Sequence, residues 1–223
     1  MKERPILFST EMVRAIIEGR KTQTRRAVKP QPRQSATEII PSNQWKGRDF
    51  VARFKYADED KYEATNLYRC PYGKPGDRLW VRETWARTGD NFHDDWPGHG
   101  DFYYKADDPF SELEPGSHTK GIFRWRPSIF MPREACRIIL EVTDVGVERL
   151  NDITDYDAKA EGIDYVIDKI TGYCGRDYLS GGYNLMTTPY HGYRSLWESI
   201  NGEGSWKMNP WVWVISFKTL DKI

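Results

Sequence analysis

The longest β-like run of this 223-residue chain extends from Ala135 to Leu150 and limits the folds open to it. Aliphatic and β-branched residues fill the run, and Asp144 and Gly146 predict a bulge or bend in its middle. A second apolar strand is expected from Trp211 to Phe217, in a central position. The predicted elements follow in the order strand, helix, several strands, two helices and strand. Because strands and helices do not alternate, the pattern favours an α+β fold on a curved or closed sheet over a doubly wound fold.

Three helices are expected, over residues 9–18, from Asn151 to Gly162, and from Tyr190 to Ile200. In the first, Ser9 or Thr10 is the expected N-cap, and Gly19 occupies the place that follows a helix C-terminus. In the second, Thr154 and Asp157 have the spacing of a capping box. The third has apolar residues along one stripe, which is typical of an amphipathic helix.

Further strands are expected at Pro5 to Phe8, Phe50 to Tyr56 and Leu79 to Trp85, and Tyr62 to Tyr72 is a possible partner of the second. In the third strand, Glu83 shares one face with Leu79 and Val81, while Trp80 lies on the other face. A carboxylate on an apolar face either lines a pocket or marks the exposed end of the strand. The sequence leaves both readings of Glu83 open.

Composition excludes several classes of protein. The net charge is zero, which argues against the wide basic surface that long DNA sites need. The three cysteines are far apart and form no C-x-x-C pair, so we expect no disulfide framework and no structural zinc site. There is no apolar run of transmembrane length and no signal peptide, so a cytoplasmic location is expected. No Gly-rich loop follows a strand and opens a helix, which excludes a dinucleotide cofactor and a P-loop.

An acidic excursion is predicted from Asp90 to Glu114, where eight acids stand against the single base Lys105. His93, His99 and the nearby His118 add possible ligands, but their spacings match no known metal pattern. We therefore predict no metal site. The excursion is expected on the surface, where its charge would compete with nucleic acid for basic residues.

A basic stretch stands out at Gly19 to Arg26, which reads Gly-Arg-Lys-Thr-Gln-Thr-Arg-Arg. Residues 19–37 hold six Lys or Arg and no acid. The stretch combines an amine, hydroxyls and guanidinium groups, which are the groups of a nucleophilic or anion-binding site. The alternative is a solvated basic strand edge that discourages pairing with other sheets.

These residues resemble the signature of the ASCH domain, a member of the PUA-like superfamily of small β-barrels associated with RNA. The general signature is Gly-x-Lys-x-x-Glu-x-Arg after the first helix; Gly19, Lys21 and Arg26 match it, and Thr24 replaces its Glu. One ASCH branch, the bacterial N4-acetylcytidine amidohydrolases, also has Gly-Arg-Lys-Thr-x-Thr-x-Arg. The chain is similar to that branch in its Gly76-Asp77 turn as well.

The resemblance implies a single ASCH domain over residues 1–223, an α+β fold of PUA-like β-barrel type with a few flanking helices. The long form is familiar from phage and prophage genomes. Relative to the small enzyme, insertions are expected at about 33–75, 86–134 and 163–205.

The resemblance also implies catalytic roles for Lys21, Thr24 and Glu161, with no cofactor and no metal. In this hypothesis Thr24 attacks the acyl carbonyl of an N4-acylated cytidine, Lys21 acts as its base, and Glu161 serves the leaving nitrogen or the deacylating water. The predicted substrate contacts are Thr22, Arg25, Arg26, Glu83, Trp80 and Trp85. Lys21 and Thr24 would point to opposite faces of a regular strand, so a shared site requires Lys21 to precede the strand.

Two other functions remain open at this stage. The chain could be a non-catalytic RNA-binding module, in which Lys21, Arg25 and Arg26 contact phosphates of short single-stranded RNA while aromatic rings stack on bases. It could also be a ribonuclease, with Lys21 stabilising the charge of the transition state. No membrane partner is expected, and the oligomeric state is not predicted.

Overall fold

The computed structural model describes residues 1–33, 36–41, 51–56, 68–87, 102–107, 125–168, 172–185 and 188–220. The acidic excursion predicted at 90–114 therefore falls largely outside the described residues, apart from 102–107.

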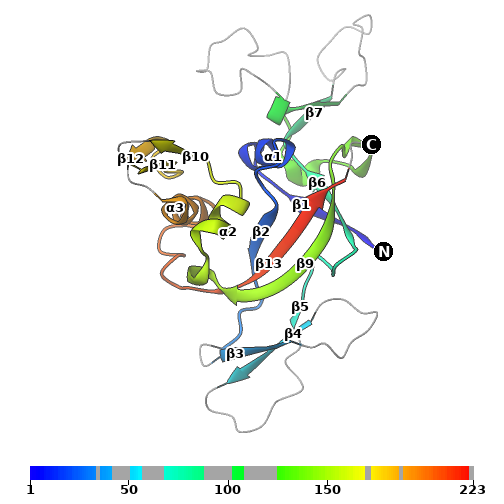
Figure 1. The fold of residues 1–223 in the computed structure, drawn as a ribbon. Helices are drawn as coiled ribbons and strands as arrows, with labels where there is room; N and C mark the ends of the chain where they lie inside the picture. The colour runs from blue at the N-terminus through cyan, green and yellow to red at the C-terminus, as the bar shows by residue number, and fades with distance from the viewer. Residues whose placement is uncertain are drawn as a thin grey trace, which may run out of the picture.

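A five-stranded mixed sheet forms the centre of the molecule, with the strand order β1-β6-β9-β13-β2 (Figure 1). Its strands are β1 (Glu3–Leu7), β6 (Arg78–Arg82), β9 (Ile139–Arg149), β13 (Trp211–Thr219) and β2 (Gln23–Ala27). The β1–β6 pair is parallel and the other pairs are antiparallel. The α+β class is confirmed, and so is the interior position of β13.

The sheet is curved, but the pairings of the described residues do not close it into a barrel, because β1 and β2 form its two edges (Figure 1). The irregularity predicted within 135–150 occurs at Thr143. Ser216 of β13 lies opposite Asp144 and Phe217 lies opposite Val142, so Thr143 is left over in the register.

Three helices accompany the sheet: α1 (Thr10–Ile17), α2 (Asp155–Ala160) and α3 (Pro189–Asn201). Ser9 caps α1, as expected, by accepting a hydrogen bond from the amide of Met12. The predicted capping box of Thr154 and Asp157 opens α2. α3 packs beside α2 (Figure 1). None of the helices in the described ranges is long and apolar enough to cross a membrane.

Smaller sheets are built from the segments predicted as insertions. They consist of β3 (Ala36–Pro41), β4 (Val51–Tyr56) and β5 (Tyr68–Arg69); β7 (Trp85–Arg87) and β8 (Phe102–Tyr104); and β10 (Tyr165–Asp168), β11 (Gly172–Arg176) and β12 (Tyr183–Leu185). The pairing of β5 with β4 agrees with the expectation for 62–72. Four 3₁₀ turns complete the described elements: η1 (Lys105–Asp107), η2 (Ser128–Phe130), η3 (Arg133–Ala135) and η4 (Leu150–Asp152).

The strand expected at Leu79 to Trp85 is interrupted. β6 ends at Arg82, and β7 begins at Trp85 in a different sheet. The backbone leaves the main sheet because the Trp85 amide and carbonyl pair with those of Arg126. The main core combines residues of the sheet with residues of all three helices and includes Ile6, Val13, Leu79, Leu140, Val142, Ala158, Leu196, Trp213 and Ile215.

Candidate active site

The chain turns sharply between α1 and β2, and this turn presents Lys21. Glu18 caps α1, and Gly19 adopts a left-handed conformation with a φ of 75°. Lys21 precedes β2 and forms an isolated antiparallel bridge with Glu161. The position of Lys21 therefore meets the geometric condition for a site that it shares with Thr24.

Glu161 is brought to Lys21 by the end of α2. It is the C-cap residue of that helix, and Gly162 follows with a φ of 83°. A Cβ atom on Gly162 would lie only 2.8 Å from the Cβ atoms of Ala15 and Lys21. Both the backbone conformation and the close approach therefore require glycine directly after Glu161.

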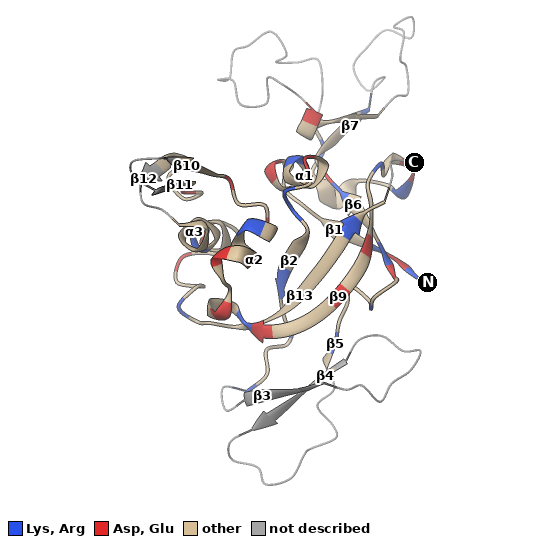
Figure 2. Cartoon of the chain, in the orientation of Figure 1, with Lys and Arg blue, Asp and Glu red and all other residues tan. Residues whose placement is uncertain are grey.

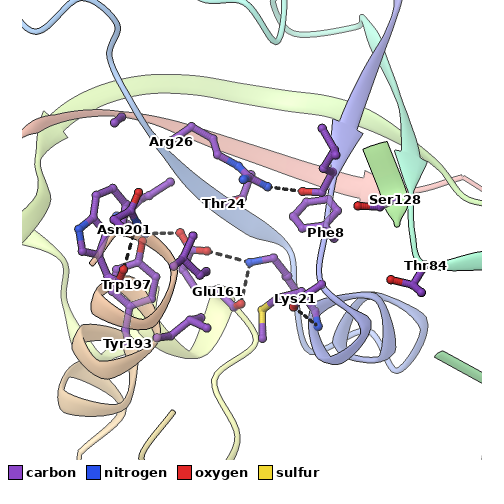
Figure 3. Close-up of a pocket in the computed structure, with 17 residues that line it drawn as sticks. Phe8, Lys21, Thr24, Arg26, Thr84, Ser128, Glu161, Tyr193, Trp197 and Asn201 are labelled. Carbon is purple, nitrogen blue, oxygen red and sulfur yellow. Dashed lines mark hydrogen bonds and ion pairs between the residues drawn. The ribbon is translucent and has the colours of Figure 1, made fainter. Parts of the chain in front are cut away.

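The side chains of Lys21 and Glu161 form a buried ion pair, and both residues are at most 3% exposed. The Lys21 Nζ donates to the Glu161 Oε2 at 2.8 Å and to the Glu161 backbone carbonyl at 2.7 Å (Figure 3). Phe8 covers the amine, with its ring centre 5.6 Å from Nζ. These contacts fix the amine and leave one of its three hydrogen positions unused.

Arg25 holds the other oxygen of the same carboxylate. Its Nη1 donates to the Glu161 Oε1 at 3.2 Å, and its Nε donates to Glu148 of β9 at 2.7 Å. Asp157 of α2 lies 3.6 Å from Nη2. Figure 2 shows basic positions on β2 and acidic positions on β9 and α2. Arg25 is buried, and it also belongs to the wall of the pocket described below.

A pocket of about 310 Å³ opens above the ion pair. Its wall includes Lys21, Thr24, Arg26 and Glu161, and α3 adds Tyr193, Leu196, Trp197, Ile200 and Asn201 (Figure 3). Thr24 is buried, and its hydroxyl makes no hydrogen bond within the described part of the chain. The pocket thus combines an amine, a carboxylate and an unengaged hydroxyl.

Burial shapes the acid–base properties of this wall. It lowers the pKa of the Lys21 amine, although the neighbouring Glu161 carboxylate opposes the change. Burial also raises the pKa of the Tyr193 phenol well above its usual value, and the charge of Glu161 adds to the effect. Tyr193 is therefore a neutral hydroxyl, whereas Lys21 can lose its proton more readily than an ordinary lysine.

Arg26 lies on the edge strand β2, and at the pocket it links this edge of the main sheet to the other edge strand, β1. Its Nη2 donates at 2.6 Å to the carbonyl of Leu7, at the end of β1. Its Nε is buried and makes no hydrogen bond to any residue in the described ranges, and its guanidinium packs over Phe8 at 5.3 Å. Arg26 is placed where a substrate oxygen could accept from it.

Glu83 was predicted either as a second pocket carboxylate or as the exposed end of a strand. It does not line the pocket, and it is not exposed. It is 1% exposed, and Arg137 binds it with two hydrogen bonds of 2.9 and 3.0 Å. Arg137 also pairs with Asp107 and lies 3.9 Å from the ring centre of Tyr104. Burial raises the pKa of the Glu83 carboxyl despite its cationic partner. Glu83 belongs to a separate buried cluster.

Three further predicted contacts also lie outside the pocket wall. Thr22 is exposed, and its backbone pairs with Ala160. Trp85 is buried in a small cluster with Met131. Trp80 is half-buried, and the guanidinium of Arg82 lies over its ring at 5.3 Å. The rings of Trp80 and Trp85 are therefore engaged within the protein.

The aromatic residues of the pocket come instead from α3, in the segment predicted as an insertion. Tyr193 and Trp197 are buried against the pocket, and their ring centres are 6.4 Å apart. The stripe of Tyr193, Leu196, Trp197 and Ile200 was visible as an amphipathic pattern. That pattern signals a buried helix face, but it does not show which neighbour the face covers.

Neither a family model, nor a curated protein, nor a solved structure matches this chain. The described residues also contain no group of three or more His, Cys, Asp or Glu side chains that could hold a metal ion.

Proposed function

We propose that this chain is an ASCH-like amidohydrolase that removes the acyl group from the exocyclic nitrogen of N4-acylated cytidine. The supporting observation is that Thr24, with its hydroxyl, Lys21, with its amine, and Glu161, with its carboxylate, line the same pocket. Its volume of about 310 Å³ is in the range of small-ligand sites. The PUA-like barrel belongs to the same proposal, since the described strands form only an open curved sheet.

In the proposed reaction, the Thr24 oxygen attacks the acyl carbonyl and its proton passes to Lys21. A neutral amine has two hydrogens and one lone pair, and the two Glu161 oxygens bound to Nζ account for both hydrogens. The lone pair is then left for the Thr24 proton. The lowered pKa of Lys21, which follows mainly from burial, favours this state.

The tetrahedral intermediate carries negative charge on the former carbonyl oxygen. Arg26 has a buried, unpaired Nε at the pocket and is the donor best placed to stabilise that charge. Collapse breaks the bond between the acyl carbon and N4, and the proton held by Lys21 passes to the leaving nitrogen. Water then attacks the Thr24 ester and gives its proton to Glu161. The bond between the acyl carbon and the Thr24 oxygen breaks, that oxygen takes the proton from Glu161, and the acyl group leaves as the carboxylic acid.

The experiment is hydrolysis of N4-acetylcytidine, followed by absorbance, with the purified wild type and with Thr24→Val and Lys21→Ala. Thr24→Val preserves the shape of the side chain and removes only the hydroxyl. We expect turnover by the wild type and a loss on the order of 10³-fold in both variants. A folded wild type without turnover would contradict the proposal and direct attention to binding of short single-stranded RNA.

A further inference from the structure

We infer that Arg25 is a positioning residue for the proposed reaction. It holds the Glu161 carboxylate so that Lys21 can act as a neutral amine. The inference rests on the proposed function for its catalytic consequence, but its electrostatic part concerns the ion network alone. Arg25 occupies one of the unspecified positions of the pattern Gly-Arg-Lys-Thr-x-Thr-x-Arg, so the resemblance assigns it no role.

The Arg25 guanidinium contacts several partners at once. Its side chain is only 1% exposed. It donates to Gln23 at 2.6 Å, to Glu148 at 2.7 Å and to Glu161 at 3.2 Å, and it lies 3.6 Å from Asp157. A planar guanidinium with this many partners has one allowed orientation, so it fixes the carboxylate that it binds.

Two cations share the Glu161 carboxylate. Its Oε2 accepts from Lys21 and its Oε1 accepts from Arg25. If Lys21 lost its proton in a simple pair, the buried carboxylate would be left without a compensating charge, at a high cost in free energy. With Arg25 present, the carboxylate keeps a cationic partner.

The balance of charge around Lys21 is set by the groups that face its amine. The groups that face its amine are Glu161 beyond α2, Arg25 and Arg26 of β2, and the Phe8 ring. Burial lowers the pKa of Lys21 most strongly, Glu161 opposes this, and the two arginines add to the lowering. A guanidinium keeps its proton at any working pH, so the effect of Arg25 is permanent.

The outer partners of Arg25 complete the arrangement. Glu148 and Asp157 are more exposed than Glu161, with side chains 30% and 24% accessible. They balance the charge of Arg25 from the solvent side and compete with Glu161 for it. Removal of Glu148 should therefore strengthen the hydrogen bond from Arg25 to Glu161 and make the Lys21 amine lose its proton at lower pH. Removal of Arg25 should have the opposite effect.

The test measures the titration of Lys21 by NMR in the full chain labelled with ¹³C-lysine, with Lys21→Arg used to assign the signal. We expect Lys21 to titrate at higher pH in Arg25→Gln than in the wild type, and at lower pH in Glu148→Gln. The matched control is Arg194→Gln, which removes an exposed arginine 3.7 Å from Glu198 on α3 and should leave the titration unchanged. This readout requires no turnover.

Kinetics then test the catalytic consequence. In Arg25→Gln, hydrolysis of N4-acetylcytidine at pH 7 should fall on the order of tenfold and recover as the pH rises. Arg25→Lys keeps the positive charge but loses the planar set of guanidinium hydrogen bonds. Its pH profile should therefore keep the midpoint of the wild type, while kcat falls.

The outcomes separate the two proposals. A Lys21 titration that is unchanged or moves to lower pH in Arg25→Gln would overturn the role of Arg25, even in an active enzyme. Shifted titrations without any hydrolysis would support the electrostatic role and overturn the proposed function. If Arg25→Gln does not fold, Glu148→Gln decides, and a Lys21 titration that does not move to lower pH overturns the inference.

Discussion

Two glutamates of this chain are equally inaccessible to solvent, and only one of them belongs to a candidate site. Glu161 is 2% exposed and Glu83 is 1% exposed, and each accepts hydrogen bonds from a cation. Glu161 has Lys21 as its partner on the wall of a pocket. Glu83 has Arg137 as its partner among Tyr104, Met131 and the end of β6, away from that pocket.

The difference between the pairs lies in the chemistry of the cation and in access. The Arg137 guanidinium donates to both Glu83 carboxylate oxygens and also pairs with Asp107, so both oxygens of Glu83 already have a donor. Because Asp107 belongs to η1, the pair also ties η1 to the end of β6. Lys21 is a point charge that can lose its proton, and Thr24, whose hydroxyl makes no hydrogen bond in the described residues, lines the same pocket. Burial of a carboxylate therefore does not by itself distinguish a candidate catalytic site from a structural ion pair.

The largest expected effect comes from exchanging the cation types. Lys21→Arg keeps the positive charge but cannot release a proton, so hydrolysis of N4-acetylcytidine should fall on the order of 10³-fold. Arg137→Lys should leave hydrolysis unchanged and reduce the free energy of unfolding by about 1–3 kcal/mol, because the two-fold hydrogen bonding is lost. Activity assays and urea unfolding of both variants check this. An active Lys21→Arg enzyme would remove Lys21 as the base.

A smaller effect is expected from neutralising the carboxylates. Glu161→Gln should lower kcat by about 10²-fold, because the amide cannot accept a proton from water. Glu83→Gln should preserve kcat and lower the free energy of unfolding by about 1–3 kcal/mol, since a charge-assisted pair is weakened. The same two assays distinguish them. Equal loss of kcat in both variants would show that the two clusters are not separate.

The sequence placed Lys21 and Glu161 in one site but did not pair Glu83 with Arg137, and the difference comes from the resemblance to the ASCH signature. Gly19 and the capping box are short-range signals that predicted the turn after α1 and the start of α2. The contact between Lys21 and Glu161 spans 140 positions, and only the resemblance predicted a shared site for them. Glu83 meets Arg137 across 54 positions, and neither a local pattern nor the resemblance indicated that contact. Its alternation with Leu79 left its burial open and gave no partner.

The same limit explains why the pocket wall of α3 was missed. Tyr193 and Trp197 lie more than 160 positions after Thr24, so their meeting depends on how α3 packs against α2. Trp80 and Trp85 were predicted as rings that could stack on a base, with a position in the core as the alternative for each. The structure instead covers Trp80 with Arg82 and buries Trp85 with Met131.

The smallest effects concern the pH dependence of stability, for which the two pairs should have opposite signs. The folded protein lowers the pKa of Lys21, chiefly through burial. Between this lowered pKa and the ordinary lysine value of about 10.4, the unfolded chain binds more protons than the folded protein. The stability of the wild type relative to Lys21→Arg should therefore rise with pH in that interval. Urea unfolding of both proteins at several pH values measures the difference, and a flat difference would contradict the lowered pKa.

The Glu83 pair should show the reverse trend on the acid side. Burial raises the pKa of Glu83 in the folded protein, while the Arg137 fork partly opposes the change. The folded protein then binds more protons than the unfolded chain above the ordinary glutamate value of about 4.3. Its contribution to stability is complete below that value and is lost as the pH rises through the raised pKa. The stability of the wild type relative to Glu83→Gln should accordingly fall with rising pH in this window. A rise instead would mean that Arg137 outweighs burial, and the Glu83 pair would then be an ordinary salt bridge.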